Sequence, residues 1–442
     1  MESIRVIEYL EKASLSNFHY ILLLLGCLIY GFTAMNTMLI SATLPAIISE
    51  WSLDSVTAGF LLSSGYIGMF IGALSCGFLA DAIGRKKALL FTIFLMSIFT
   101  GLCSIANDIS SMFILRFLAG IGLGGTLPQP GVYISEYVPA KYRGKFVGFV
   151  ETSWVFGALL AIAFPFLLIP LYGWRLTFLI AFIPLFLIIL VIFFAPESLR
   201  YLEFKNKYEE ILKILKKHKL ISEEENKEKI FYKLKDTSKK ISFKEIFSLE
   251  YRKRTLLLWI LWAVLVYTYH GIFLWLPTIY IKEFGFEIIK SLYWTLIVTL
   301  IQVPGYFSAT FLLDIIGRRK VLIIYLGLAG ISCLLLSIAK DVNVILLWSC
   351  FISFFNLGAW AGLYTYTPEL YPTRIRGTGS GAAASIGRLA GILAPTLTGF
   401  LYSIGKLLFP FIVFTLAHLI ASLSVIFLGI ETKGKVLEEI SE

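Results

Sequence analysis

The chain has 442 residues, of which 58% are hydrophobic and only 15% are charged, and its mean hydropathy is +0.81. About a quarter of the residues of a soluble domain are charged, so this composition excludes a soluble globular protein. The formal net charge of +10 does not indicate nucleic-acid binding, because the Lys and Arg residues lie in short loops between apolar runs and in one central block. The composition predicts a polytopic membrane protein.

Hydropathy predicts a first group of six membrane spans, because apolar runs of about 20 residues are long enough to cross a bilayer. A charged leader (1–17) precedes the first run, which has no small-residue cleavage pattern after it and is therefore expected to be retained. The six spans are placed at roughly 18–43, 56–80, 88–106, 111–136, 145–170 and 175–195, and define an N-terminal bundle over 18–195. A Lys-rich polar linker with helix-forming residues follows at 196–254.

A second group of six spans follows the linker. These spans are placed at roughly 255–281, 290–313, 320–339, 343–368, 378–404 and 407–430, and define a C-terminal bundle over 255–430. A charged tail (431–442) comes after them. The predicted fold class is an all-α membrane protein with twelve transmembrane helices in two six-helix bundles.

An internal duplication relates the two bundles. Asp81-Ala-Ile-Gly84-Arg85-Lys86-Lys87 recurs 233 positions later as Asp314-Ile-Ile-Gly317-Arg318-Arg319-Lys320. The same offset carries Asp108 onto Asp341, Glu136 onto Glu369, Pro139 onto Pro372, Arg143 onto Arg376 and Gly148 onto Gly381, with no gap. A period this long does not fit a solenoid, whose repeats run about 20–50 residues. The duplication therefore predicts two bundles of similar structure.

The positions of Lys and Arg predict the orientation of the chain in the membrane. The loops after spans two, four, eight and ten are basic, whereas the loops between them carry little positive charge. Short loops rich in Lys and Arg stay in the cytoplasm. We therefore expect a multi-pass protein of the plasma membrane with both termini cytoplasmic, near membrane lipid and with no nucleic-acid partner.

The residue patterns of enzymes, cofactor sites and metal sites are absent from the sequence. The five cysteines (Cys27, Cys76, Cys103, Cys333 and Cys350) stand singly inside apolar runs, without the paired spacing of a zinc site or a disulfide framework. No HExxH motif, paired catalytic carboxylates or phosphate-binding glycine loop with its following Lys is present. The sequence predicts a protein that is not an enzyme and has no cofactor or metal.

Several motifs resemble those of the major facilitator superfamily. The duplicated Asp-x-x-Gly-Arg-(Lys/Arg)-Lys loop resembles the signature of that superfamily, and so does Arg116-Phe-Leu-Ala-Gly120 in span four. Pro196-Glu197-Ser198-Leu199-Arg200, just after span six, is similar to an element of the sugar-porter branch. The resemblance implies two six-helix bundles related by a pseudo-two-fold axis, which rock about a binding site near the membrane midplane.

Further motifs resemble a narrower group, the prokaryotic niacin permeases and metabolite:proton symporters, relatives of organic ion transporters and synaptic vesicle glycoprotein 2. These motifs are Glu151-Thr-Ser-Trp154, Gly271-Ile-Phe-Leu-Trp275-Leu-Pro277, Phe354-Phe355-Asn356-Leu-Gly-Ala-Trp360 and Tyr364-Thr-Tyr-Thr-Pro368-Glu369. The resemblance implies uptake of a small organic anion, such as a nicotinate-like aromatic carboxylate, by a monomer. A sugar or polyol transporter and a non-transporting membrane sensor or binder are the alternatives.

The duplicated loops suggest a gate at the cytoplasmic side. In the family, the counterpart of Asp81 lies near the start of span eleven, where Arg376 and the positive end of the helix favour an anion. By the duplication, Asp314 is expected to face the start of span five near Arg143. The expected gating residues are Asp81, Arg85, Glu136, Arg143, Asp314, Arg318, Glu369 and Arg376.

Arg388 is the leading candidate for substrate binding. It stands about eleven residues into span eleven, roughly 16 Å deep at 1.5 Å per residue, among small apolar residues. A cation at that depth is a functional-site hypothesis, and a guanidinium grips a carboxylate with two hydrogen bonds. A structural pairing with an acidic residue such as Glu151 is the alternative. The other expected substrate-binding residues are Asn36, Trp154, Tyr269, Trp275, Gln302, Asn356, Trp360 and Tyr364.

Span one departs from the pattern of the related niacin permeases. They carry aspartates in a Phe-Asp-Ala-Met-Asp pattern, where this chain has Phe32-Thr33-Ala34-Met35-Asn36. If protons are coupled through those aspartates in relatives, this chain must use another group or none. Glu151 and His270 are the candidates for proton coupling. Facilitated diffusion is the alternative to symport.

Overall fold

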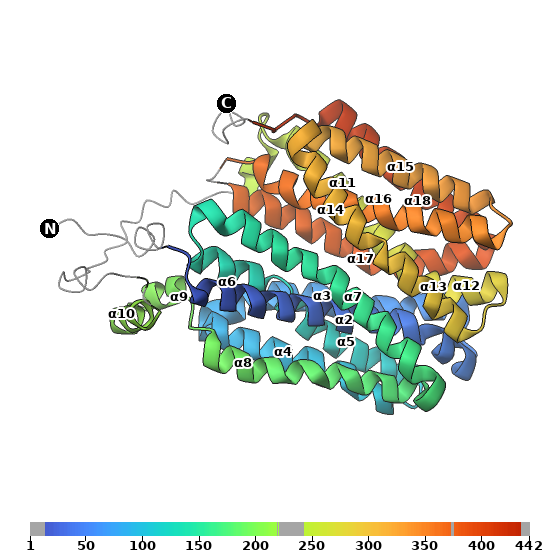
Figure 1. Cartoon of the computed structure of the whole chain (residues 1–442), viewed down its shortest axis with the longest axis horizontal. Helices are drawn as coiled ribbons and strands as arrows, with labels where there is room; N and C mark the ends of the chain where they lie inside the picture. The colour runs from blue at the N-terminus through green and yellow to red at the C-terminus, as the bar shows by residue number, and fades with distance from the viewer. Residues whose placement is uncertain (1–13, 219, 221–242, 373–374, 435–442) are drawn as a thin grey trace.

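The structure is a computed structural model that describes residues 14–218, 220, 243–372 and 375–434. Its helices run side by side along the long axis of the molecule, as Figure 1 shows. The N-terminal half comprises α2 (Asn17–Trp51), α3 (Ser55–Ile83), α4 (Arg85–Leu102), α5 (Ile109–Thr126), α6 (Gln129–Tyr137), α7 (Ala140–Thr177), η2 (Phe178–Leu185) and α8 (Phe186–Phe194). The described secondary structure is helical throughout, in agreement with the predicted all-α class.

The C-terminal half repeats this arrangement and packs alongside the first half (Figure 1). It comprises α11 (Arg252–Phe273), α12 (Leu276–Phe284), α13 (Ile288–Leu300), α14 (Gln302–Ile316), α15 (Arg318–Ile338), α16 (Val342–Glu369), α17 (Arg376–Gly405) and α18 (Leu408–Leu428). Between the halves, the linker forms α9 (Leu199–Phe204), α10 (Tyr208–Lys217) and η4 (Phe243–Phe247). Most of the predicted leader, the centre of the linker and most of the tail lie outside the described residues, so the predicted domain boundaries stay a prediction.

Eleven helical stretches in the described chain are long and apolar enough to cross a membrane. One of them, Lys141–Phe194, has 54 residues. A continuous helix of that length would extend about 80 Å, more than twice the thickness of a bilayer. Gly173 breaks it with a left-handed backbone (φ +75), which glycine adopts readily. This stretch therefore holds two of the predicted spans, which accounts for the twelve-helix fold.

The duplicated residues mark two distinct ends of the bundle. We call "basic end" the end of the bundle that carries the loops at Gly84 and Gly317. We call "opposite end" the end that carries Asp108 and Asp341. At the opposite end, Asp108 accepts a hydrogen bond from the Ser111 amide (2.7 Å) at the start of α5. Asp341, its duplicate, accepts one from the Asn343 amide (2.8 Å) at the start of α16. A carboxylate at the N-cap satisfies amides that have no partner inside the helix.

The two halves meet closely at the opposite end. Ser41 of α2 donates to the carbonyl of Phe273 (2.9 Å) at the end of α11. Ser63 of α3 donates to the carbonyl of Ile392 (2.7 Å) in α17. Gly59 permits the crossing of α3 and α17, because a Cβ there would lie 2.8 Å from the carbonyl oxygen of Pro395. These contacts close the opposite end and leave space between the halves further along the bundle.

Candidate functional site

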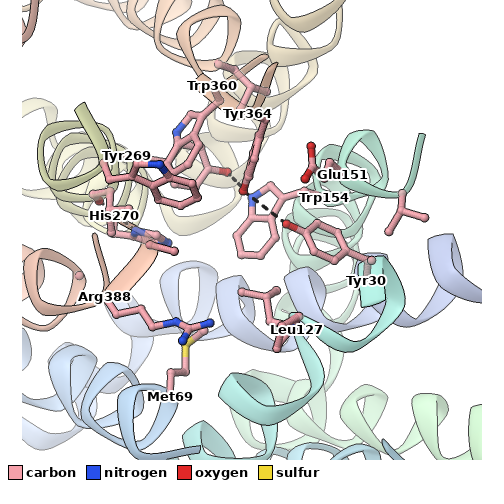
Figure 2. Close-up of a pocket in the computed structure, with 18 of the residues that line it drawn as sticks. Tyr30, Met69, Leu127, Glu151, Trp154, Tyr269, His270, Trp360, Tyr364 and Arg388 are labelled. Carbon is pink, nitrogen blue, oxygen red and sulfur yellow. Dashed lines mark hydrogen bonds between the residues drawn. The ribbon is translucent and has the colours of Figure 1, made fainter. Parts of the chain in front are cut away.

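A cavity of about 260 Å³ lies between the two halves, in the middle of the bundle. Residues of α2, α3, α6, α7, α11, α14, α16 and α17 line it. Aromatic side chains form a large part of the wall, as Figure 2 shows. The aromatic residues are Tyr30, Tyr66, Trp154, Trp262, Tyr269, Tyr306, Trp360 and Tyr364, together with the imidazole of His270. A concave, mostly apolar cavity with a few polar groups is the usual form of a small-molecule site.

Arg388 and Glu151 are the charged residues among those that line the cavity. Arg388 projects from α17 and Glu151 from α7, on different walls of the cavity (Figure 2). Within the described chain, neither side chain has an ion pair. The alternative of a structural pair between these two residues is therefore not what the structure shows. Both groups face the cavity, where a ligand could reach them.

Hydrogen bonds and ring contacts between the halves run across the cavity. Trp154 of α7 donates its indole N–H to the hydroxyl of Tyr269 in α11 (2.9 Å). The hydroxyls of Tyr30 in α2 and Tyr364 in α16 lie 3.5 Å apart. These side chains connect the two halves and form part of the cavity wall (Figure 2). A movement of one half against the other would therefore change the cavity directly.

His270 is held by its neighbours on one side. One ring nitrogen, Nδ1, lies 2.9 Å from the carbonyl oxygen of Val266. The ring also packs edge-on against Tyr66 of α3, with 4.8 Å between the ring centroids. This geometry fixes the orientation of the imidazole and leaves the other ring nitrogen toward the cavity side of α11.

Four residues expected to bind the substrate do not line this cavity. Gln302 lies behind Tyr269, whose hydroxyl is 3.5 Å from its side-chain oxygen. Asn356 donates to Thr268 (3.0 Å) deep inside the C-terminal half. Trp275 donates to the carbonyl of Pro395 (3.0 Å), near the closed opposite end. The fourth residue, Asn36, is fully buried between helices of the N-terminal half. Their role in binding stays a prediction.

Four aromatic lining residues were not singled out from the sequence. They are Tyr30, Tyr66, Trp262 and Tyr306, which lie in α2, α3, α11 and α14. Each is one aromatic residue in a span that contains several, and aromatic side chains in spans more often pack against helices or lie at the membrane interface. Whether such a residue faces the same space as Arg388 or Glu151 depends on how the spans pack. The sequence therefore offered no signal that distinguished these residues from the other aromatic residues of their spans.

At the basic end of the N-terminal half, the duplicated loop forms a compact polar cluster. Arg85 forms an ion pair with Glu136, whose side chain is only 1% exposed. Glu197, from the Pro-Glu-Ser element, accepts a hydrogen bond from the amide of Lys86 (3.0 Å) at the start of α4. Gly84 has a left-handed backbone (φ +102), and a Cβ there would collide with the carboxylate of Glu197. The glycine of the motif is therefore required for this carboxylate to cap α4.

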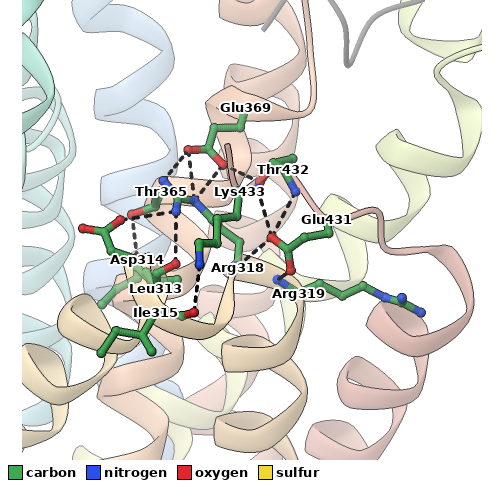
Figure 3. A network of polar contacts seen from close by, with 11 residues as sticks. Leu313, Asp314, Ile315, Arg318, Arg319, Thr365, Glu369, Glu431, Thr432 and Lys433 are labelled. Atoms are coloured by element: carbon green, nitrogen blue, oxygen red, sulfur yellow. Dashed lines mark hydrogen bonds and ion pairs between the residues drawn. The ribbon is translucent and has the colours of Figure 1, made fainter. Parts of the chain in front are cut away.

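The C-terminal half repeats this cluster, as Figure 3 shows. Arg318 pairs with Glu369 (3.1 Å) and more distantly with Asp314 (3.4 Å). Glu431 accepts a hydrogen bond from the amide of Arg318 (2.9 Å), and Gly317 lies against its carboxylate. Glu431 follows Glu197 by 234 positions, one more than the repeat offset, and takes the same place. Neither cap was expected from the sequence, although the duplication extends to both.

The predicted contacts of the gate across the two halves are not made in this conformation. The carboxylate of Asp81 is exposed and forms no ion pair within the described residues. Asp314 pairs inside its own half, and Arg143 and Arg376 each donate to a carbonyl of their own half. Every described ion pair joins residues of one half or of the linker. The gate stays a prediction for a conformation in which the basic end is closed.

Comparisons with known proteins agree with this geometry. A family model described as "Sugar (and other) transporter" matches residues 20–442. The niacin transporter NiaP of Acinetobacter baylyi is 36% identical over 442 residues, which cover 98% of this chain and 99% of that protein. The benzoate transport protein of the same organism is 31% identical over 409 residues, which cover 91% of this chain and 87% of that protein. The xylose transporter XylE from E. coli, in a partially occluded inward-open conformation, has the same fold, with a TM-score of 0.75 at 21% identity over 95% of this chain and 100% of that one.

Proposed function

The chain belongs to the sugar (and other) transporter family of the major facilitator superfamily, and we propose that it carries a small aromatic carboxylate of the nicotinate class across the membrane. The observation that carries this proposal is Arg388, a cation inside an aromatic cavity that lacks an acidic protein partner in the described chain. A buried cation without a partner is costly, and a bound carboxylate would compensate its charge. Relatives named for niacin and benzoate transport support an aromatic acid as the substrate.

The aromatic wall suits the ring of such a substrate. Planar rings pack favourably on tryptophan and tyrosine side chains in edge-on or offset arrangements. Trp154 and Tyr269 are already held by their mutual hydrogen bond, so they present fixed surfaces to a ligand. In this arrangement the carboxylate lies at Arg388 and the ring lies toward Trp154 and Trp360.

Glu151 is the first candidate for proton coupling. It lines the same cavity, has no ion pair within the described residues, and lies close to several tyrosine hydroxyls that could pass a proton. An intramembrane carboxylate beside a cavity is a common element of proton relays. His270 is the second candidate, although its Nδ1 is engaged by the carbonyl of Val266. A proton that enters with the carboxylate would make transport electrically neutral.

We further propose that the basic end faces the cytoplasm, at the plasma membrane, by the excess of Lys and Arg in its loops. With the opposite end closed by Ser41, Ser63 and Gly59, this conformation is then open toward the cytoplasm. Outward opening would separate those contacts and bring the two duplicated clusters of the basic end together. Asp81 would then approach Arg376, and Asp314 would approach Arg143, each across the two halves.

The family description and the fold keep a sugar or polyol as the alternative substrate. Sugar recognition needs many hydrogen bonds, and amide side chains are suited to make them. The amides of Gln302, Asn356 and Asn36 are all outside the lining of the cavity. A cavity with few polar groups and one guanidinium favours an anion with an apolar body over a sugar. A sensor without transport activity would bind the same anion but carry none across.

Uptake of labelled nicotinate and benzoate into proteoliposomes, with and without an inward proton gradient, tests the proposal. We expect saturable uptake of at least one aromatic acid by the wild type and none by Arg388→Ala. Arg175→Ala is the matched control, because this arginine pairs with Glu50 at the opposite end, away from the cavity. Uptake of xylose that aromatic acids do not inhibit would overturn the assignment in favour of a sugar. Saturable binding of the acids without uptake would favour the sensor.

A further inference from the structure

A second arginine, Arg116 of α5, is buried where the cavity does not reach. Arg116 is only 2% exposed. Its one hydrogen bond within the described chain is from Nη1 to the backbone carbonyl of Asn36 in α2 (3.3 Å). Its Nε has no hydrogen-bond partner among the residues that the structure describes. A guanidinium stays protonated in proteins, so a full positive charge is buried here with one weak neutral contact.

Such a charge needs a counter-charge, because an unpaired ion in a low-dielectric interior is strongly destabilising. None of the ion pairs in the described residues involves Arg116. The neighbouring side chains that interact with it electrostatically are Cys103 and Tyr66, neither of them an acid at neutral pH. In span one, the residues Thr33 and Asn36 are buried and carry no charge. The residues around Arg116 therefore supply no negative charge.

Several buried polar side chains on the helices that pack against α5 have no hydrogen-bond partner within the described residues. They are the side-chain amide of Asn36 in α2 and the hydroxyls of Ser97 and Thr100 in α4. The helices α2 and α4 run in the same direction, and Thr33 contacts Met96 (3.6 Å) between them. One turn further along both helices lie Asn36 and Thr100, at the level of Arg116. Buried polar atoms without partners are rare, so this group of them calls for a ligand.

Gly65 of α3 lies close to the guanidinium of Arg116. A Cβ at this position would lie 3.3 Å from Nη2 and 3.7 Å from Nε of Arg116. The next residue, Tyr66, lines the central cavity, and its hydroxyl has no hydrogen-bond partner within the described chain. Because residue 65 is a glycine, no side chain from this position of α3 covers the Nη2 and Nε edge of the guanidinium.

We propose that Arg116, the amide of Asn36 and the hydroxyls of Ser97 and Thr100 bind a small monovalent anion of the chloride class. These groups offer N–H and O–H donors with one positive charge, the donor set that a halide requires. The anion supplies the negative charge that the residues around Arg116 do not. It binds independently of the transported substrate, because Arg116 does not line the central cavity.

The test is the thermal stability of the purified wild-type protein in chloride and in isethionate at equal ionic strength. We expect chloride and bromide to raise the Tm by several degrees, in a saturable manner, because a ligand stabilises the state that binds it. The variant Asn36→Asp places a carboxylate beside Arg116. In that variant we expect no rise with chloride, and a Tm in isethionate at or above that of the wild type in chloride.

A second variant and a control keep the test decisive if Asn36→Asp folds poorly. Thr100→Val removes one hydroxyl donor at nearly constant volume, and we expect the chloride concentration for half the effect to rise roughly tenfold. Thr43→Asp places a carboxylate at a buried position two turns along α2, where the hydroxyl donates to the carbonyl of Leu39 in the same helix (3.2 Å). This variant should have a lower Tm and keep the chloride effect. An equal Tm of the wild type in both salts would show that water alone solvates Arg116 and would overturn the proposal. A chloride effect that Asn36→Asp and Thr100→Val both leave intact would overturn it too, because the anion would then bind elsewhere.

Discussion

Arg388 and Arg116 lie in the apolar parts of the two halves and differ in what surrounds them. Arg388 is partly exposed to a cavity of about 260 Å³ with aromatic walls, whereas Arg116 is 2% exposed and packed against α2 and α3. Neither has a carboxylate partner among the described residues. Arg388 can therefore meet a large organic anion, whereas the close packing around Arg116 excludes one. The comparison shows that the space beside a buried charge, more than the charge itself, decides which ligand it can take.

The largest effect is expected from removing the charge in the cavity. Arg388→Ala should lower kcat/KM for an aromatic carboxylate about 100-fold or more, because it removes a charged hydrogen bond made in a desolvated site. Its Tm should stay close to that of the wild type, because Arg388 makes no hydrogen bond in the described protein that the substitution would break. Arg388→Lys should recover part of the activity, since an ammonium keeps the charge and loses the two-pronged geometry. A large loss of Tm with unchanged kcat/KM would assign Arg388 a structural role.

Substitution of Glu151 is expected to abolish proton coupling and to leave substrate binding intact. In Glu151→Gln, counterflow of a bound carboxylate should persist, while accumulation driven by a proton gradient should disappear. If one proton moves with each substrate, a gradient of one pH unit drives about tenfold accumulation of the substrate. We therefore expect about tenfold accumulation by the wild type and none by Glu151→Gln. His270→Gln is the matched variant, because it alters the second candidate in the same cavity. Full accumulation by Glu151→Gln would move the coupling role to His270. No gradient-driven accumulation by the wild type would make the protein a uniporter.

At Arg116, a change in stability is expected without a change in substrate affinity. Arg116→Met removes the buried charge and keeps an apolar side chain of similar length. Replacing a buried charge by an apolar group is often neutral or stabilising, so the variant should equal or exceed the wild-type Tm in a chloride-free buffer. Its KM for the carboxylate should be unchanged. A raised KM with an unchanged Tm would place Arg116 in the transport pathway and remove the contrast with Arg388.

The smallest effect is expected from Asp108, a solvent-exposed carboxylate that serves as a reference for the two arginines. The hydrogen bond from the Ser111 amide lowers the pKa of the exposed Asp108 carboxyl at the opposite end. Because the pKa is lower in the folded state, the stability contributed by Asp108 is present above its unfolded pKa of about 4 and is lost as the pH falls through the folded value. The Tm of Asp108→Asn should lie slightly below that of the wild type at neutral pH, and the difference should close in acid. A difference that grows in acid would contradict this sign.

The two basic-end clusters show how far the duplication alone could lead. The matched positions of Arg85, Glu136, Arg318 and Glu369 predicted polar clusters in both halves, and each arginine does pair with the glutamate of its own half. The roles of Glu197 and Glu431 were missed, although the Pro-Glu-Ser element was recognised as a family motif. Each cap requires a carboxylate that is distant in the sequence to lie at the start of another helix. The packing of the linker and of the tail against the bundle decides whether it does.

The sequence by itself determined the class, the number of spans, the duplication and the cation at Arg388. These features are encoded locally, in runs of apolar residues that match the thickness of a bilayer, in a repeated motif, and in one charge at a predictable depth. Only the tertiary structure decided which side chains share the cavity. Tyr30 and Asn36 lie on the same helix, yet one lines the cavity and the other is sealed beside Arg116. The face that a helical residue presents depends on its rotation against neighbouring helices, and in spans that are apolar all round no hydrophobic pattern fixes that rotation.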